Sequence, residues 1–269
     1  MSRSNHSSHL HTARSRRRVL VTLSIPAVLL GTLTAISSPA GASNAVTLYV
    51  NGSLGTVVSG CSSPGANACE TLQQAITAAE SYTNSDVTIL VAAGTYNEHD
   101  TINVPSTDTL VIQGAGAPVT TINANNSGSV VMINAGIATL SGLTISGGNA
   151  SNGAGIYSNG TTTIENDSIS NNSTGSAIYI VGGTTSILKN DTIANNVGSA
   201  NGGAAYIANT ANATFENDTI FNDSGGLYGT GIYNNGTANL TNDTLFNSPG
   251  TYGYGLTTSG GVTTNGVSI

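Results

Sequence analysis

The sequence is poor in charge, and above all in positive charge. Only 7% of the 269 residues are charged, and all five arginines lie within the first 18 positions. After residue 42 the chain holds a single lysine, Lys189, against thirteen acidic residues, so this part carries a formal charge of −12. Such a surface repels phosphate backbones and anionic lipids. We therefore expect no nucleic-acid partner, and no membrane partner once the leader described below is removed.

The sequence also lacks tryptophan and any segment that would separate two domains. Glycine is abundant, with 34 residues, and threonine and asparagine are frequent, which is unusual for an ordinary globular domain. No low-complexity linker or run of charge interrupts the chain after residue 42. We therefore expect residues 43–269 to form one domain, rich in tight turns.

The arginines belong to a segment typical of an export signal. They precede the apolar run "VLVTLSIPAVLLGTLTAI", and "SPAGA" then offers small residues for cleavage after Ala42. We interpret residues 1–42 as a cleaved secretory peptide. The stretch "SRRRVL" resembles a twin-arginine signal. An uncleaved anchor is the alternative, since the run is about long enough to span a bilayer. The protein is thus expected to be secreted or held at the cell surface.

Only two cysteines are present, Cys61 and Cys69. In an oxidising compartment such a pair is expected to close a small-loop disulfide. A metal site is the alternative, but it lacks a second pair of ligands. We therefore expect a disulfide and no bound cofactor at this point of the chain.

One helix and many strands are predicted. In "ETLQQAITAAESYT", residues 70–83, the apolar side chains of Leu72, Ile76 and Ala79 recur at helical spacing. From "VTILVAAGTY" onward, short β-branched runs alternate with Gly, Asn and Ser, which predicts strands and turns. Residues 43–85 are expected to cap the β domain.

A repeat is the strongest feature of the sequence. The stretch "IENDSISNN" returns as "LKNDTIANN", "FENDTIFND" and "LTNDTLFNS". A period of 22 to 27 residues is typical of one turn of a β-solenoid, with insertions absorbed in the turns. Apolar residues head the successive copies at Leu140, Ile164, Leu188, Phe215, Leu240 and Val262.

Stacked coils place equivalent residues above one another, about 4.8 Å apart, so each repeated position becomes a column. Asparagine in such a column can chain its amides and tolerates a left-handed backbone. We therefore expect a structural ladder of Asn166, Asn190, Asn217 and Asn242.

The next position is acidic in every copy. Each carboxylate is expected to accept hydrogen bonds from backbone N–H groups of its own turn. Calcium is the alternative, since it would relieve repulsion between neighbouring carboxylates. The calcium candidates are Asp167, Asp191, Asp218 and Asp243.

The position before the asparagine ladder holds Glu165, Lys189 and Glu216. We expect an ion ladder worth about 0 to 1 kcal/mol per exposed pair. Two glutamates so placed approach the carboxylate separation of inverting glycosidases, but the intervening lysine would obstruct a sugar.

A second strand in each repeat carries tyrosine. Tyr157, Tyr179 and Tyr233 offer an aromatic strip that could face a glycan. Packing between coils is the favoured interpretation, because "AAYIAN" places Ile207 in this column and Thr257 follows later.

These features resemble the right-handed parallel β-helix of the pectin-lyase-like superfamily. Within it, the chain is similar to secreted proteins of the polymorphic outer-membrane and right-handed β-helix-repeat kind. "ETLQQAITAA" followed by "VTILVAAGTYNE" resembles their N-terminal capping helix and first strand, and "LVIQGAGAPVTTINA" an early coil. The resemblance covers about residues 46–269. It implies an all-β right-handed parallel β-helix with a short N-terminal capping helix, but not one activity, since the superfamily mixes enzymes with adhesins.

The catalytic residues of this superfamily have no match here. Its lyases abstract a proton with arginine or lysine, and its hydrolases cluster aspartates with a histidine and a basic residue. After residue 42 the chain has no arginine and no such cluster, so we assign no catalytic position. Glu98, His99 and Asp100 form the one acid and histidine group, interpreted as a solvated turn with catalysis as the alternative.

We therefore expect an exported, non-catalytic structural or adhesive module that binds a glycan or a surface protein. A polysaccharide-active hydrolase or lyase on the same fold is the alternative. Because "VTTNGVSI" matches the opening of another repeat, we also expect an uncapped end and end-to-end self-association, or a further portion of chain.

Overall fold

The computed structural model describes residues 44–56, 60–199, 201–225, 228–248 and 255–269. The expected leader, residues 1–42, lies outside these ranges. Among the described residues, no helix has the length and apolar character needed to cross a bilayer.

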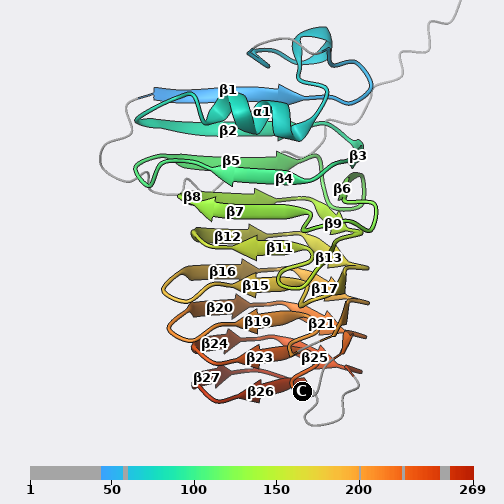
Figure 1. Ribbon diagram of the computed structural model, residues 1–269, viewed down its shortest axis with the longest axis vertical. Helices are drawn as coiled ribbons and strands as arrows, with labels where there is room; N and C mark the ends of the chain where they lie inside the picture. The colour runs from blue at the N-terminus through green and yellow to red at the C-terminus, as the bar shows by residue number, and fades with distance from the viewer. Residues whose placement is uncertain (1–43, 57–59, 200, 226–227, 249–254) are drawn as a thin grey trace, which may run out of the picture. The chain divides into compact units, whose positions relative to one another are not determined.

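The described chain winds through seven coils stacked along one axis (Figure 1). Each coil gives one strand to each of three parallel sheets, which we call sheets A, B and C. Four consecutive coils add a short fourth strand, and these strands form sheet D. All strand pairs within the sheets are parallel, which confirms the predicted parallel β-helix.

Sheet A contains nine strands: one from each of the seven coils, one before the first coil and one after the last. Its strands are β1 (Asn44–Val50), β2 (Ser85–Val91), β5 (Thr109–Gly114), β8 (Ile137–Ser141), β12 (Thr161–Glu165), β16 (Thr185–Lys189), β20 (Asn212–Glu216), β24 (Thr237–Thr241) and β27 (Gly261–Asn265).

Sheets B and C contain seven strands each. Sheet B consists of β3 (Gly94–Asn97), β6 (Thr120–Asn123), β9 (Thr144–Ser146), β13 (Ser168–Ser170), β17 (Thr192–Ala194), β21 (Thr219–Phe221) and β25 (Thr244–Phe246). Sheet C consists of β4 (Asp100–Asn103), β7 (Val131–Ala135), β11 (Ile156–Ser158), β15 (Ile178–Ile180), β19 (Ala205–Ile207), β23 (Ile232–Asn234) and β26 (Leu256–Thr258). Sheet D consists of β10 (Asn149–Ala150), β14 (Ser173–Thr174), β18 (Val197–Gly198) and β22 (Ser224–Gly225).

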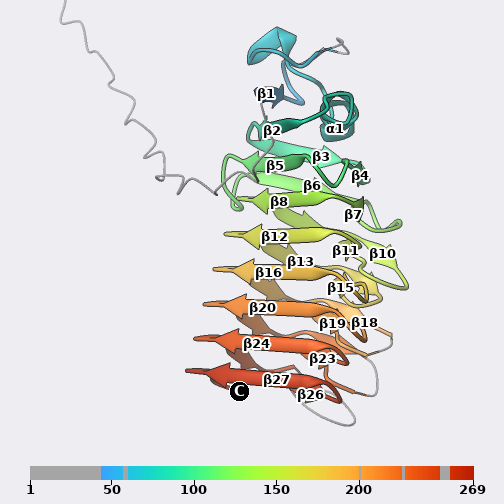
Figure 2. The ribbon, with the colours of Figure 1, turned by 90° about the vertical axis from the view of Figure 1, so that its left-hand side faces the viewer.

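Helix α1 (Leu72–Ala79) packs beside the first coils and contacts β1, β2 and β4 (Figure 2). It begins after Thr71, whose side chain accepts a hydrogen bond from the Gln74 backbone N–H, while the Gln74 side chain bonds back to Thr71. The helix is shorter than the predicted 70–83. A turn of 3-10 helix, η1 (Gly65–Asn67), precedes it.

Strand β1 was not predicted. It lies before the helix in the chain and pairs with β2 in register, from Asn44 with Ser85 to Val50 with Val91. The strand in "VTILVAAGTY", taken as the first, is therefore the second. The Cys61–Cys69 disulfide holds the connecting loop beside β1, where Tyr49 bonds to both cysteines through the backbone.

The core is built from columns of inward side chains. In sheet B the column is wholly buried and consists of Tyr96, Ile122, Ile145, Ile169, Ile193, Ile220 and Leu245. In sheet A, Leu140, Ile164, Leu188, Phe215 and Leu240 stack in the same way.

The last member predicted for the sheet A column was wrong. Leu240 pairs with Thr264, whereas Val262 pairs with Ala238. A shift of two residues keeps a side chain on the same face of a strand, so the apolar pattern could not distinguish the two registers. Strands β26 and β27 form the last edges of sheets C and A, and β27 is exposed along its length.

Candidate functional site

A continuous column of four tyrosines crosses the outer face of sheet C. Tyr157 pairs with Tyr179, Tyr179 with Tyr206, and Tyr206 with Tyr233. The sequence had placed Ile207 in this column, and that prediction was wrong. The core position on β19 is occupied by the small Ala205, so Tyr206 points outward and Ile207 is buried. We call these four residues the tyrosine column.

The rings of the tyrosine column stack on one another. The centroids lie 5.8 Å apart for Tyr157 and Tyr179, at an angle of 1° between the ring planes, and 5.0 Å apart for Tyr179 and Tyr206, at 10°. Tyr206 and Tyr233 lie 5.2 Å apart with a tilt of 31°. The exposed ring of Tyr228 extends the group, 6.4 Å from Tyr233. Because the inner rings cover each other's faces, the column presents mainly ring edges and phenol groups to solvent.

The phenol groups of the column can donate and accept hydrogen bonds. Burial, and then the neighbouring phenols of Tyr206 and Tyr157, raise the pKa of Tyr179 above its ordinary value of 10.0. Tyr206 Oη accepts a hydrogen bond from Asn235 Nδ2 at 3.1 Å. The column therefore offers a row of neutral donors and acceptors at the spacing of the coils.

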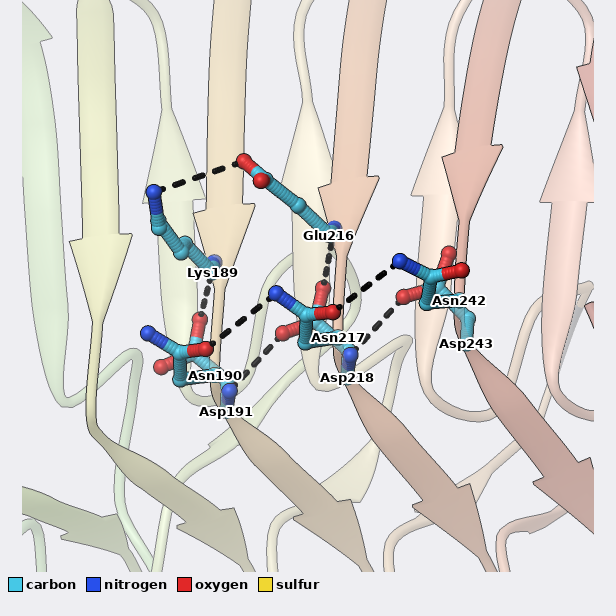
Figure 3. Close-up of polar contacts among 8 residues, drawn as sticks. All are labelled: Lys189, Asn190, Asp191, Glu216, Asn217, Asp218, Asn242 and Asp243. Atoms are coloured by element: carbon cyan, nitrogen blue, oxygen red, sulfur yellow. Dashed lines mark hydrogen bonds and ion pairs between the residues drawn. The ribbon is translucent and has the colours of Figure 1, made fainter. Parts of the chain in front are cut away.

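The predicted ion ladder is in register but incompletely paired. Glu165, Lys189 and Glu216 occupy equivalent positions of β12, β16 and β20. Lys189 Nζ lies 3.5 Å from Glu216 Oε2 (Figure 3), and this is the one ion pair within 4.0 Å in the described parts of the chain. Both side chains are about two-fifths exposed, so the pair contributes about 0 to 1 kcal/mol.

The aspartate column is buried and points at the backbone. Asp218 Oδ1 accepts from the Asp191 N–H at 2.8 Å, and its Oδ2 accepts from the Glu216 N–H at 3.2 Å (Figure 3). Asp191 and Asp243, on the coils before and after, make the equivalent pair of bonds. Asp167 accepts from the Leu143 N–H at 2.6 Å. Asp191, Asp218 and Asp243 thus each join two coils and cap their own turn, whereas Asp167 joins two coils through Oδ1 and its buried Oδ2 has no partner among the described residues.

Burial is the main influence on the acidity of this column. It raises the pKa of Asp191 to about 8 and that of Asp218 to about 7, although the N–H bonds act in the opposite direction. No group of three or more histidine, cysteine or acidic side chains in the described ranges could hold a metal ion. Because the carboxylates already serve N–H groups, the geometry lends the calcium hypothesis no support.

The asparagine ladder turns each coil from sheet A to sheet B. Asn217 has a φ of 60°, and the other three members lie between 56° and 58°. Asn217 Nδ2 donates to Asn190 Oδ1, and Asn242 Nδ2 to Asn217 Oδ1, both at 3.4 Å (Figure 3).

A third polar column was missed by the sequence analysis. Asn172, Asn196 and Asp223 are buried at the corner after sheet B and are linked by hydrogen bonds between coils. The signal was present as the last residue of "ISNN", "IANN" and "IFND".

The structure gives Glu98, His99 and Asp100 different surroundings. Glu98 caps α1, with Oε1 accepting from the Leu72 N–H at 2.9 Å and Oε2 from the Gln73 N–H at 3.0 Å. His99 Nδ1 lies 3.2 Å from the carbonyl oxygen of Ser129. Asp100 is buried, so the interpretation of the three residues as a solvated turn was wrong for it. Burial, and then the charge of Glu98, raise the pKa of Asp100 well above its ordinary value.

Two solved structures share this fold. Both are of the pectin methylesterase from Aspergillus niger, one in its deglycosylated form and one in its penultimately deglycosylated form. The first is 16% identical, with a TM-score of 0.54 and 86% of each chain covered. The second is 17% identical, with the same TM-score and 87% of each chain covered. At such identities the likeness shows the fold alone.

No curated protein matches this sequence. Residues 110–269, more than half of the chain, match the family model of the right-handed β-helix region. The match agrees with the stacked parallel coils and with the handedness that the sequence resemblance implies. The chain therefore belongs to the right-handed β-helix family.

Proposed function

We propose that the protein is an exported, non-catalytic β-helix module that binds a neutral glycan along the tyrosine column. The observation that carries this proposal is the continuity of the column: Tyr206 fills the expected gap, so four consecutive coils present tyrosine on one partly exposed face. Exposed tyrosine combines apolar area with a hydrogen-bonding group, which is the chemistry of a site for a hydroxyl-rich ligand.

The charge of the chain supports a neutral ligand. The part after residue 42 has a formal charge of −12, and Lys189, its one lysine, is paired with Glu216. An acidic polymer would be repelled by this surface. The fold itself is found in a pectin methylesterase, so a β-helix of this kind is compatible with a polysaccharide ligand.

The proposal that the module is non-catalytic rests on its charged side chains. Proton abstraction beside a sugar carboxylate requires a cation or metal to stabilise the anion that develops, which contributes several kcal/mol. Asp218 and the equivalent aspartates of the neighbouring coils accept hydrogen bonds from backbone N–H groups, and Glu98 caps a helix. Export is supported by the expected leader and by the Cys61–Cys69 disulfide.

Binding to insoluble polysaccharides tests the proposal. The wild type, the double variant Tyr179→Ala with Tyr206→Ala, and a control double variant are mixed with cellulose, xylan, chitin and calcium pectate, and the bound fraction is measured. The control is Phe221→Ala with Phe246→Ala, because these two rings also stack at 5.2 Å but lie on sheet B. Circular dichroism checks that all three proteins are folded.

We expect retention on at least one neutral polymer, about a tenfold loss of affinity in the tyrosine variant, and none in the control, since the hydrogen bonds of two phenol groups are worth about 1 to 3 kcal/mol. Equal binding by both variants, or retention on pectate alone, would contradict the proposal.

A further inference from the structure

The buried column of Asn172, Asn196 and Asp223 contains one side chain of a different kind. The three residues occupy equivalent corners of successive coils and are at most 1% exposed. Asn196 Oδ1 accepts from the Asn172 backbone N–H at 3.0 Å and from Asn172 Nδ2 at 3.1 Å. The Asn196 amide therefore receives two bonds from the coil before it.

Asp223 continues this pattern with one of its oxygens. Its Oδ1 accepts from the Asn196 backbone N–H at 2.9 Å and from Asn196 Nδ2 at 2.8 Å. Oδ1 thus takes the place of the amide oxygen of an asparagine. The other oxygen, Oδ2, takes the place of the amide nitrogen.

That nitrogen is a donor in the two asparagines. Asn172 Nδ2 donates to the carbonyl oxygen of Ile145 at 3.2 Å, and Asn196 Nδ2 to that of Ile169 at 3.1 Å. In the register of sheet B the next carbonyl of this series belongs to Ile193. Asp223 Oδ2 is buried and has no hydrogen-bond partner. An oxygen at a donor's position completes the column only when it carries a proton.

We propose that Asp223 is a pH-sensitive lock between the coils of β20 and β16. In the protonated form, Oδ2–H donates to the Ile193 carbonyl group and completes the buried column. In the ionised form, Oδ2 and the Ile193 carbonyl oxygen are both acceptors, so no hydrogen bond forms between them. The contact between the coils then weakens.

The surroundings of Asp223 favour the protonated form. Burial raises its pKa to about 7, against the effect of the two bonds from Asn196, and no charged side chain contributes to the shift. On the next coil the equivalent position is Ser248, which does not titrate in this range. The pKa of Asp218, at the other corner of the same coil, is also raised to about 7, but both of its oxygens accept N–H groups, so it lacks the unpartnered oxygen of Asp223.

The sign of the effect follows from linkage. The ordinary pKa of 3.8 applies to the unfolded chain, so between this value and about 7 the folded protein holds a proton that the unfolded chain has lost. The stability contributed by Asp223 therefore falls as the pH rises through this window and stays low above it. Asparagine supplies the same donor at every pH.

The test compares Asp223→Asn with the wild type in thermal unfolding at pH 4.5 and pH 8.5, with Asp218→Asn as the matched control. We expect Asp223→Asn to raise the melting temperature by several degrees at pH 8.5 and by clearly less at pH 4.5. Asp218→Asn is expected to lower it at pH 8.5, because it sets an amide donor against an N–H. A loss of stability in both variants at pH 8.5 would overturn the proposal.

A second measurement remains decisive if a variant fails to fold. In protein labelled with ¹³C at the aspartate carboxyl carbons, the proposal requires one resonance, absent from Asp223→Asn, to titrate near pH 7. Ser248→Ala provides an alternative assignment, because it should shift the same resonance without removing it. Titration of that resonance near the ordinary value of 3.8 would refute the lock.

Discussion

Aspartate fills two buried columns of this protein with opposite hydrogen-bonding demands. In one column Asp191, Asp218 and Asp243 accept N–H groups with both carboxylate oxygens, and in the other Asp223 Oδ2 stands at a donor's position. Residue type alone therefore does not tell which hydrogen bonds a buried carboxyl makes. The neighbouring coils decide it.

Replacing Asp218 by asparagine should destabilise the protein at pH 8.5. The change removes one acceptor and turns an NH₂ group toward a backbone N–H, which costs about 1 to 3 kcal/mol. Urea unfolding measures the effect, and Asp86→Asn should stay within about 0.5 kcal/mol, because Asp86 is only partly buried and an asparagine oxygen can still accept the bond from the Thr109 hydroxyl group. If Asp218→Asn unfolds like the wild type at this pH, the bonds assigned to its carboxylate are unimportant.

The asparagine ladder gives a second prediction at the residue scale. Asn217 has a φ of 60°, which alanine adopts only at a cost of about 1 to 2 kcal/mol and glycine adopts freely. We expect Asn217→Ala to lower the free energy of unfolding clearly more than Asn217→Gly. Equal losses would mean that the amide bonds to Asn190 and Asn242, and not the backbone conformation, account for asparagine here.

The repeat predicted the asparagine and aspartate positions well, because each recurs at a fixed place after an apolar residue. The tyrosine column was predicted with an error at Tyr206. A slip of one residue exchanges the two faces of a strand, and the sequence alignment gave the larger Ile207 the wrong face. In this coil the small Ala205 fills the core position that isoleucine fills in the coil before. Only the packing of the neighbouring coils shows this.

At the scale of elements, the capping helix was predictable and the strand before it was not. The apolar spacing in α1 is helical, whereas β1 has no counterpart in the repeat and pairs with a strand that follows 41 positions later. The same limit applies to Glu98, which lies 26 residues from the N–H group that it caps. Such pairings form because the first coil brings distant segments of the chain together, so no local sequence pattern predicts them.

Replacing Glu98 by glutamine should loosen α1. The carboxylate bonds to the first two N–H groups of the helix, where a negative charge is favourable by about 0.3 to 2 kcal/mol. Hydrogen exchange of the α1 amides measures the effect. Glu80→Gln is the matched control, because Glu80 lies at the other end of the helix and its Oε1 accepts from the Asn103 N–H.

We expect exchange of the α1 amides to accelerate in Glu98→Gln and to change less in Glu80→Gln. Faster exchange in Glu80→Gln than in Glu98→Gln would show that the charge of Glu98 does not stabilise the start of this helix.

At the scale of the whole molecule, the buried acids should make stability depend on pH. The pKa of Asp191 is raised to about 8, and those of Asp218 and Asp223 to about 7, from 3.8. The folded protein therefore holds protons that the unfolded chain has lost, and the free energy of unfolding should fall as the pH rises from about 4 to about 8. Thermal unfolding should show a lower midpoint at pH 9 than at pH 5. A midpoint that rises over this range would contradict the assignment of these groups.

The central claim is that this β-helix binds a neutral glycan and does not cleave it. The most direct measurement incubates the wild type with one neutral polymer that retains it and with pectate and calcium, then assays in the same tubes the bound protein, new reducing ends and unsaturated uronide. We predict retention on the neutral polymer, dependent on Tyr179 and Tyr206, with neither product above the protein-free control. Clear product formation that is abolished by changing Lys189, or retention that is indifferent to both tyrosines, would contradict the account.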